Sequence, residues 1–533
     1  MTEPRTIPGL IARAEREFPD REAVVDDGVR WSFAELADEV YRVAGAMIAA
    51  GVEHGDRVAI WAPNGRQFVA AALGAVTAGA VLVPVNTRFR GHEAAWILRK
   101  SGARLLVVSN GFLGNDYLAM LREADPDLVP GGGPGGGLGP GAAGPALDVV
   151  TLSGTGGSPW REFLNRSASV SRETVLRRAA AVTETDISDM FFTSGTTGRP
   201  KGVLTAHGQN IRVFQAWSHG VGLRPGDRYL IINPMFHTFG YKAGVLACLL
   251  EGATMVLQRV FDAEQAIRLI EDEKITVLPG PPALYASILD HPARQGADLG
   301  SLRLAVTGAA VVPVTLVERL RTEMFPEVII AYGLTESCGT VTVGSKDADA
   351  ETISRTVGKP IEGTEVIVAA ADGTSLPPGQ HGEVLVRGYN VMRGYFQDPE
   401  ATAAAIDARG WLHTGDVGTF GDDGNLRITD RLKDMFVVGG FNAYPAEIEQ
   451  VITRHARVTE AAVIGVPDER LGEVGRAYVI PRPGTTVTEE EIVAFCRERL
   501  ANFKVPRSVR IVAVLPRNAG GKVLKTRLRE ESG

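Results

Sequence analysis

The sequence predicts an α/β protein: a large N-terminal body of βα-layered sheets, a distorted antiparallel subdomain, and a small α+β C-terminal domain. Three observations lead to this class. The chain has 533 residues, enough for about three to four structural units. Short apolar strands alternate with longer amphipathic segments from Arg57 to Tyr332, and short strands bounded by Gly and Asp turns follow near Gly382.

The composition excludes several other classes of protein. Hydrophobic residues make up 44% and charged residues 22%, which is typical of a folded globular chain and not of a disordered or collagen-like one. The formal net charge of −7 gives no overall positive field to hold nucleic acid or anionic lipid. Cys248, Cys338 and Cys496 are odd in number and fit no zinc spacing. They predict a reducing, cytoplasmic location without structural disulfides.

Neither the first residues nor the longest uncharged segment indicates integral membrane association. Residues 1–10 hold a carboxylate and two prolines, where a signal peptide would have a basic segment and an apolar run. Phe68–Val85 contains 18 uncharged residues, mostly Ala and Gly, with Pro84 near its end. We expect a buried helix that turns into a strand at Ala80–Val85.

The body is expected to contain largely parallel sheets, because short β-branched runs alternate with segments of helical length. The expected strands are Val58–Trp61, Val81–Val85, Leu105–Val108, Met190–Phe192, Tyr229–Ile232, Thr254–Leu257, Leu302–Val306 and Val328–Ala331. Strands at Gly382–Arg387 and Asn425–Thr429 predict the antiparallel subdomain. The domain boundary is placed at Asp430–Asp434, giving domains 1–429 and 435–533 with a hinge at 430–434.

Two further segments have clear local signals. Thr488 and Glu491 have the spacing of a capping box, which predicts a helix over Glu489–Leu500. Residues 131–145 contain nine glycines and three prolines, which predicts a surface loop. A Gly-x-Gly-x-x-Gly match inside this loop has no strand before it and no helix after it, which argues against a dinucleotide site.

A loop rich in glycines and hydroxyls follows the expected strand at Asp189–Phe192. Thr193–Gly202 combines three threonines, a serine, three glycines and two cations. Glycines let backbone N–H groups converge on phosphate oxygens, hydroxyls add donors, and Lys201 adds positive charge. Lys201 precedes Gly202, so the loop is not a Walker loop. The residues of this predicted polyphosphate cradle are Thr193, Ser194, Gly195, Thr196, Thr197, Gly198 and Lys201.

Five motifs, in this order, carry a family resemblance: Thr193–Gly202, Tyr332–Glu336, Trp411–Asp416, Asp430–Asp434 and Gly521–Lys522. Over essentially its whole length the chain resembles the adenylate-forming superfamily of acyl-CoA synthetases, luciferases and peptide-synthetase adenylation domains. The resemblance implies a mobile C-terminal domain that rotates between two half-reactions. It also implies an ATP-dependent acid:CoA ligase, which forms an acyl adenylate with release of pyrophosphate and then a thioester with release of AMP.

The resemblance assigns roles within the ATP site. The β- and γ-phosphates are expected on Thr193–Lys201, the α-phosphate on Thr335, and Mg²⁺ on Glu336. Such groups are needed because a carboxylate that attacks the α-phosphorus of ATP brings like charges together. The residues similar to the family's adenine and ribose sites are Gly308, Ala309, Ala310, Tyr332, Asp416 and Arg431.

The resemblance also assigns roles to residues near and beyond the domain boundary. Lys433 occupies the hinge position. Lys522 is expected to bridge the carboxylate and the α-phosphate; its neighbour Lys525 is the alternative, and the glycines before Lys522 favour Lys522. The loop of Gly439, Gly440 and Phe441 is similar to one that lines a pantetheine tunnel, which favours CoA as the second substrate.

The residues that indicate the acyl site are less specific than the motifs of the ATP site. His237 matches the family's histidine at the acyl tunnel, with a satisfied core histidine as the alternative. Phe236, Tyr241 and Lys242 are candidate pocket residues. Tyr241 and Lys242 are polar where a fatty-acid tunnel would favour apolar groups, so a ring ketone is a plausible ligand; a structural role for both remains an alternative.

The segments Asn233–Gly244, Leu278–Tyr285, Leu289–Arg294 and Arg431–Phe436 are similar to actinobacterial synthetases. Those enzymes activate a methyl-hexahydroindanedione propanoate left from the steroid C and D rings. The alternatives are a medium- or long-chain fatty acyl-CoA synthetase, an enzyme that loads a carrier protein, and a non-catalytic adenylate-binding protein. The expected partners are therefore a small carboxylic acid, ATP with Mg²⁺, and CoA. The sequence leaves the oligomeric state open, with a homodimer as one alternative.

Overall fold

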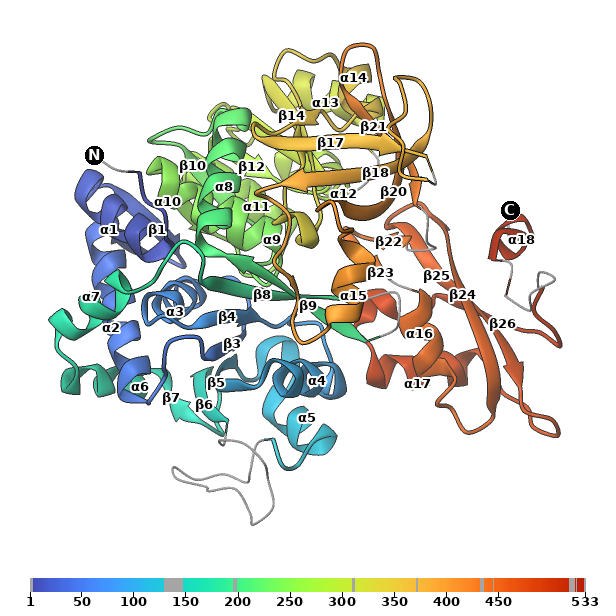
Figure 1. Ribbon diagram of the computed structural model, residues 1–533, viewed down its shortest axis with the longest axis horizontal. Helices are drawn as coiled ribbons and strands as arrows, with labels where there is room; N and C mark the ends of the chain where they lie inside the picture. Colours follow the sequence, from blue (N-terminus) through green and yellow to red (C-terminus); the bar gives the residue numbers. More distant parts are fainter. Residues whose placement is uncertain are drawn as a thin grey trace.

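The computed structural model describes residues 3–128, 147–194, 199–308, 312–370, 372–431, 436–443, 445–516, 523 and 525–531. Within these ranges the chain forms four sheets and has a mixed α/β fold, as the sequence predicts. Figure 1 shows a large body that contains the N-terminus, and a smaller unit at its side built from the C-terminal strands and helices.

The first large sheet has the strand order β19-β9-β8-β4-β3-β5-β6-β7. From β8 to β7 the strands are parallel, whereas β9 and β19 are antiparallel at one edge. The strands are β3 (Arg57–Trp61), β4 (Val81–Pro84), β5 (Ala103–Ser109), β6 (Asp148–Ser153), β7 (Ser158–Pro159), β8 (Ile187–Ser194), β9 (Pro200–Ala206) and β19 (Gly394–Tyr395).

The second large sheet has the order β16-β15-β14-β13-β12-β10-β11-β1-β2 and is parallel from β14 to β1. Its strands are β1 (Glu22–Asp26), β2 (Val29–Ser32), β10 (Arg228–Ile231), β11 (Thr254–Leu257), β12 (Val277–Pro279), β13 (Leu304–Gly308), β14 (Glu327–Tyr332), β15 (Thr342–Val343) and β16 (Lys359–Pro360). All eight strands expected in the body are therefore confirmed, with ends shifted by up to three residues.

Helices separate and cover the two sheets. The largest apolar cluster combines residues of both sheets with helices α1, α2, α3, α8 and α10. Val58 and Ile60 of β3 belong to this cluster, whereas Ala59 and Trp61 belong to the cluster of α4 and α5 on the other face, because successive strand residues point to opposite faces. These helices are α1 (Ile7–Glu17), α2 (Phe33–Ala49), α3 (Arg66–Thr77), α4 (Gly91–Ser101), α5 (Tyr117–Ala124), α8 (His207–Val221) and α10 (Ala247–Glu251).

Two antiparallel units complete the chain. The first is the sheet β17-β18-β20-β21, and the second is β23-β22-β25-β24 with β26 paired to β25. Their strands are β17 (Thr364–Ala369), β18 (Gly382–Gly388), β20 (Leu412–Phe420), β21 (Leu426–Arg431), β22 (Phe436–Val438), β23 (Phe441–Ala443), β24 (Val458–Asp468), β25 (Gly472–Pro481) and β26 (Ser508–Ile511). The C-terminal helices are α16 (Pro445–Ile452), α17 (Glu489–Arg499) and α18 (Lys525–Glu530).

The capping box predicted from Thr488 and Glu491 is only half formed in the C-terminal unit. Helix α17 starts where expected, and the hydroxyl of Thr488 accepts a hydrogen bond from the Glu491 N–H. The carboxylate of Glu491 instead forms an ion pair with Arg457. A tertiary ion pair therefore replaces the second half of the predicted capping box.

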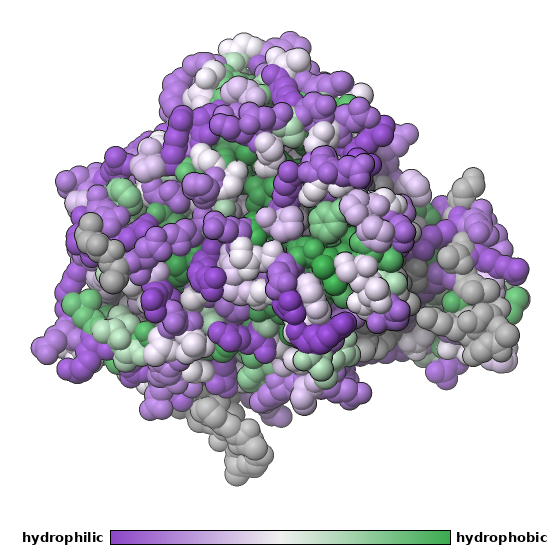
Figure 2. Space-filling view, turned by 45° about the horizontal axis from the view of Figure 1, so that its top comes forward, coloured by the Kyte–Doolittle hydropathy of each residue, from purple (hydrophilic) through white to green (hydrophobic). Residues whose placement is uncertain are grey.

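The buried helix expected within Phe68–Val85 is confirmed as α3, followed by strand β4. No helix among the described residues is long and apolar enough to cross a membrane. Figure 2 shows hydrophilic residues around the edge of one face and hydrophobic residues gathered nearer its centre. The glycine-rich segment 131–145 lies outside the described residues.

A buried neutral histidine predicts how stability depends on pH. His207 starts α8, and its Nδ1 accepts a hydrogen bond from the N–H of Ile7 at 3.3 Å. Burial lowers the pKa of His207 from 6.5 to about 4. Between pH 6.5 and about pH 4 this histidine binds a proton in the unfolded chain but not in the folded chain. The free energy of unfolding therefore falls as the pH decreases.

At pH 5 this difference in pKa lowers the free energy of unfolding by on the order of 2 kcal/mol. His207→Asn keeps an acceptor near the Nδ1 position but does not titrate. The variant should therefore lose less stability than the natural protein between pH 7 and pH 5, as measured by urea unfolding. Equal losses in the two proteins would show that another group is responsible.

Candidate active site

The phosphate corner of the site is built by the β8–β9 hairpin. Thr193 lies opposite Lys201 in the antiparallel register, so both side chains flank the loop that joins the strands. The hydroxyl of Thr193 donates to Oε1 of Glu336 at 3.3 Å. The fold therefore joins the hydroxyl-rich loop and the predicted metal carboxylate, which are 143 positions apart.

Tyr395 is a member of this corner that the sequence analysis missed. Its phenolic O–H donates to the same Glu336 Oε1 at 2.9 Å, and Lys201 Nζ lies 5.0 Å from the centre of its ring. Tyr395 comes from the two-residue strand β19, which pairs with β9. No local pattern in the sequence identifies it, because its position depends on that long-range pairing.

Backbone geometry holds Glu336 in place. It lies in a single turn, η5 (Thr335–Ser337), that starts with predicted Thr335 and ends at Cys338 in the left-handed region. The Glu336 carbonyl accepts a hydrogen bond from the Met392 N–H at 2.8 Å. A Cβ on Gly333 would lie 2.3 Å from a backbone oxygen, so only glycine allows this close return of the chain.

The predicted adenine and ribose residues contact each other. Tyr332, at the end of β14, donates its O–H to Asp416 Oδ2 at 2.6 Å, and Asp416 on β20 is 1% exposed. Gly308 ends β13, where a Cβ would lie 2.3 Å from the carbonyl oxygen of Ala331. The approach of two strands is thus sufficient to require glycine at position 308.

His237 follows strand β10, and its side chain is exposed. The N–H of Phe239 donates to its Nδ1 at 3.3 Å, and burial lowers the pKa of the ring to about 4. His237 is therefore neutral at physiological pH, and the neighbouring Phe236 is half-buried.

Tyr241 and Lys242 begin a buried π-helical turn, η3 (Tyr241–Leu246). Lys242 is 0% exposed, and its ammonium lies 2.9 Å from Asp189 Oδ1 and 2.8 Å from Thr205 Oγ1. Asp189 neutralises the charge, and both partners belong to the strands that carry the phosphate loop. The contacts favour the structural alternative for Lys242. The Tyr241 hydroxyl is buried, with no hydrogen-bond partner among the described residues.

The predicted CoA loop is the turn between β22 and β23. Gly439 and Gly440 have φ values of 55° and 85°, which a two-residue hairpin requires. A Cβ on Gly440 would lie 3.3 Å from Pro281 of the body. The tip of this C-terminal hairpin therefore touches the body close to the end of β12.

Gly195, Thr196, Thr197, Gly198, Ala309, Ala310, Lys433 and Lys522 lie outside the described residues. Ser194 and Arg431 are described as backbone in β8 and β21. Lys525, the alternative to Lys522, lies 2.7 Å from Glu449 in an ion pair.

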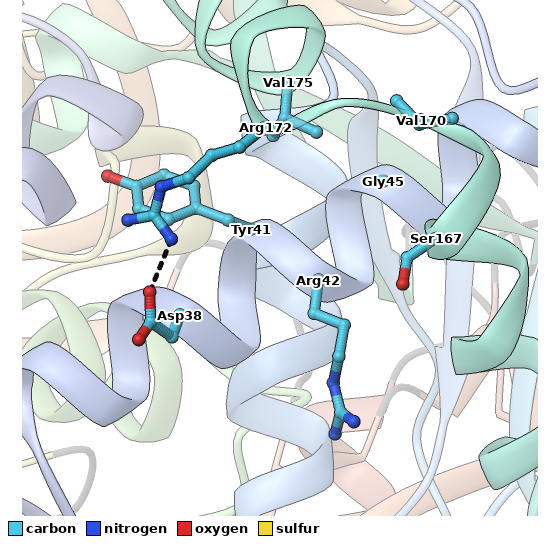
Figure 3. Close-up of a pocket in the computed structure, with 8 residues that line it drawn as sticks. All are labelled: Asp38, Tyr41, Arg42, Gly45, Ser167, Val170, Arg172 and Val175. Atoms are coloured by element: carbon cyan, nitrogen blue, oxygen red, sulfur yellow. Dashed lines mark hydrogen bonds and ion pairs between the residues drawn. The ribbon is translucent and has the colours of Figure 1, made fainter.

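A separate hollow of about 340 Å³ lies beside α2 (Figure 3). Its walls include Arg42, Arg172 and Ser167. Arg172 is bound to Asp38 and Arg42 to Glu39, each at 2.5 Å. Because carboxylates already neutralise both cations, we assign no ligand to this hollow.

Two family models together match most of the chain. Residues 11–396 match the AMP-binding enzyme family, and residues 447–522 match the AMP-binding enzyme C-terminal domain. Among solved structures, an amide bond synthetase from Marinactinospora thermotolerans superposes with a TM-score of 0.84 at 30% identity, covering 98% of this chain and 99% of that chain.

Two curated relatives cover the whole length at high identity. A 7a-methyl-1,5-dioxo-octahydro-1H-inden-4-yl propanoyl:CoA ligase of Rhodococcus jostii is 51% identical over 540 residues, all of both chains. The ligase of the same name from Mycobacterium tuberculosis is 51% identical over 530 residues, 99% of both chains. A feruloyl-CoA synthase of Amycolatopsis is 35% identical over 98% of both chains.

Proposed function

The chain belongs to the AMP-binding enzyme family and is an AMP-forming acyl-CoA ligase, and from this premise we propose that its acid is the methyl-hexahydroindanedione propanoate. The observation that carries the proposal is the 51% identity, over the full length, to two ligases named for this acyl group. The enzyme would then act in degradation of the steroid C and D rings.

We propose that adenylation takes place at the corner formed by Thr193, Lys201, Glu336 and Tyr395. Lys201 and the loop after Thr193 would hold the β- and γ-phosphates and neutralise charge that moves onto pyrophosphate. Thr335 would hold the α-phosphate, Asp416 would accept hydrogen bonds from the ribose hydroxyls, and Lys522 would bridge the attacking carboxylate and the phosphate.

The residues present fit a magnesium ion supplied with ATP. The described residues contain no group of three or more His, Cys, Asp or Glu side chains placed to hold a metal. Mg²⁺ commonly binds one or two carboxylates together with substrate phosphates and water. Glu336, half-buried and oriented by Thr193 and Tyr395, would be that carboxylate, and the ion would offset phosphate charge.

We propose that the thioester step uses a second domain orientation. A change of backbone dihedrals at Lys433, between domains 1–429 and 435–533, would withdraw Lys522 and bring the Gly439–Phe441 loop to the body. The contact of Gly440 with Pro281 supports this role for the loop. The CoA thiol would then attack the acyl carbonyl and release its proton to solvent, and AMP would leave with the electrons of the broken C–O bond.

The acyl pocket would begin at Phe236 and His237. Neutral His237 can donate one hydrogen bond to the substrate carboxylate or gate the tunnel, but it supplies no charge there. The orphan hydroxyl of buried Tyr241 is compatible with a ring-ketone ligand. The alternative of a fatty acyl chain is kept because a medium-chain acyl-CoA ligase of Danio rerio is 33% identical to this chain.

The test is AMP release with ATP, Mg²⁺ and CoA across acetate, octanoate, palmitate, an aryl acid and the indanedione propanoate. We expect kcat/KM for the last acid to exceed the others by about 100-fold, because a pocket that hydrogen-bonds a ring ketone rejects acids without one. A preference for octanoate or palmitate would leave the reaction unchanged and replace the substrate.

A further inference from the structure

A buried ionic cluster joins the N-terminal body to the C-terminal residues. Lys504 lies in the short helix η6 (Asn502–Lys504). Its ammonium is 2.9 Å from Glu93 Oε1 on α4 and 2.6 Å from Glu447 Oε1 on α16. The exposed fractions of the Lys504, Glu93 and Glu447 side chains are 1%, 9% and 6%. We call these three residues the interdomain cluster.

Each charge in the interdomain cluster depends on its partners. Burial alone disfavours the ammonium, but the carboxylates of Glu447 and Glu93 outweigh it and raise the pKa of Lys504. Burial also raises the pKa of Glu447. Removing one partner of a buried pair leaves a desolvated charge uncompensated. The cluster therefore favours the arrangement in which all three side chains meet.

Apolar contacts extend the same junction. Lys504 Nζ lies 4.4 Å from the centre of the Phe89 ring, in the segment before α4. Ala501, two residues before Phe503, is fully buried in the cluster formed by α4, α5 and the first sheet. Figure 1 shows α17 beside α4, and residues of the two helices are in contact. Ala501, Phe503 and Lys504 therefore pack against the body, whereas Asn502 is exposed.

The interdomain cluster is connected to the Gly439–Phe441 loop. Phe503 precedes Lys504 and stacks on Phe441, with ring centres 4.8 Å apart. Arg88 belongs to the body, and its guanidinium lies 5.5 Å from the centre of the same Phe441 ring. Fixing Lys504 therefore fixes the loop that touches Pro281.

We propose that Lys504, Glu93 and Glu447 form a latch that selects the domain orientation for thioester formation and contributes nothing to adenylation. The inference rests on the proposed function, in which the two half-reactions use different orientations. Lys504 is a positioning residue: it acts on the CoA loop through Phe503 and Phe441. Breaking the latch depopulates the orientation in which that loop meets the body.

The test separates the two half-reactions in the full-length enzyme. Adenylation is followed as pyrophosphate release without CoA, and thioester formation as acyl-CoA made from supplied acyl adenylate and CoA. Lys504→Met keeps an unbranched side chain, one atom shorter, and removes the charge. For this variant we expect thioester formation to fall about 10- to 100-fold and adenylation to change less than about twofold. Retained adenylation also shows that the variant is folded.

Two further variants sharpen the result. Glu93→Gln breaks only the arm that crosses between domains, and it keeps an acceptor for the Arg90 N–H that caps α4 at 2.9 Å. It should reproduce the selective loss, and Glu93→Gln with Lys504→Met should be no worse than Lys504→Met alone. Lys274→Met, which removes an exposed ion pair with Asp298 at 2.8 Å, should change neither step.

The outcomes distinguish the latch from the proposed function. Equal loss of both half-reactions in Lys504→Met, or full thioester activity in both variants, would overturn the latch while the natural enzyme still forms acyl-CoA. Additive losses in the double variant would show that Glu93 and Lys504 act separately and would also overturn it. If the natural enzyme forms no adenylate from any acid of the panel, the proposed function fails instead.

Discussion

Replacing Glu336 with glutamine should lower the rate of adenylate formation about 100- to 1,000-fold and raise the Mg²⁺ concentration needed for half-maximal rate. Glutamine keeps the size of the side chain and an oxygen that can accept from Thr193 and Tyr395. It removes the negative charge that would hold the cation. ATP–pyrophosphate exchange, measured over a range of Mg²⁺ concentrations, gives both quantities.

Tyr395→Phe is the matched comparison for this prediction. It removes one hydrogen bond, 2.9 Å long, to the same carboxylate oxygen and leaves the charge in place. A loss of about tenfold or less is expected, because one neutral donor orients the carboxylate without neutralising it. If Glu336→Gln leaves the metal titration unchanged, the cation binds elsewhere and Glu336 has a structural role.

Replacing Lys522 with alanine should abolish adenylation, by about 1,000-fold or more, and leave thioester formation from a supplied acyl adenylate largely intact. The lysine is expected to neutralise the approach of a carboxylate to a phosphate, which occurs only in the first step. The measurement uses the two assays given for Lys504→Met, which are pyrophosphate release without CoA and acyl-CoA formation from supplied acyl adenylate.

Lys525→Ala is the control for Lys522→Ala. Lys525 lies three positions away, and its ammonium is paired with Glu449 at 2.7 Å. Its loss should change adenylation by less than about threefold, the scale of a partly exposed ion pair. Equal loss of both half-reactions in Lys522→Ala would overturn the assignment of this lysine to one orientation only.

Together, Lys522→Ala and Lys504→Met form a reciprocal pair. The first should remove adenylation and keep the thioester step, and the second should do the reverse. Both residues lie in the C-terminal part of the chain, so a general loss of stability in that part cannot produce opposite effects. Only a difference between two functional orientations of the domain produces this pattern.

Much of the fold could be predicted from local patterns. The strands β3, β4, β5, β8, β10, β11, β13 and β14 are short β-branched runs between helical segments, and each was found near its expected position. Strand β9 was not expected, although it carries Lys201. It is antiparallel to β8, and such a hairpin pairing leaves no signal of its own in the alternation of strands and helices.

The candidate site was predictable in its residue types and less so in its contacts. Thr193 and Glu336 belong to motifs with a recognisable order, so their sequence context was sufficient to select them. Tyr395 could not be found in this way, because its role follows from pairing between β19 and β9. Lys242 was selected for its polarity, whereas the structure shows its charge neutralised by Asp189.

The sequence by itself determined the α/β class, the order of the motifs and the chemistry that their side chains can perform, because periodicity and residue type act over a few neighbouring positions. Tertiary structure alone decided that Tyr332 contacts Asp416, that Tyr395 contacts Glu336, and that Lys504 is enclosed by Glu93 and Glu447. These contacts join residues from 57 to 411 positions apart. Removing charges and hydroxyls from water is unfavourable unless they are paired. These contacts gain strength from the low dielectric around them, which exists only once the sheets and helices have packed together.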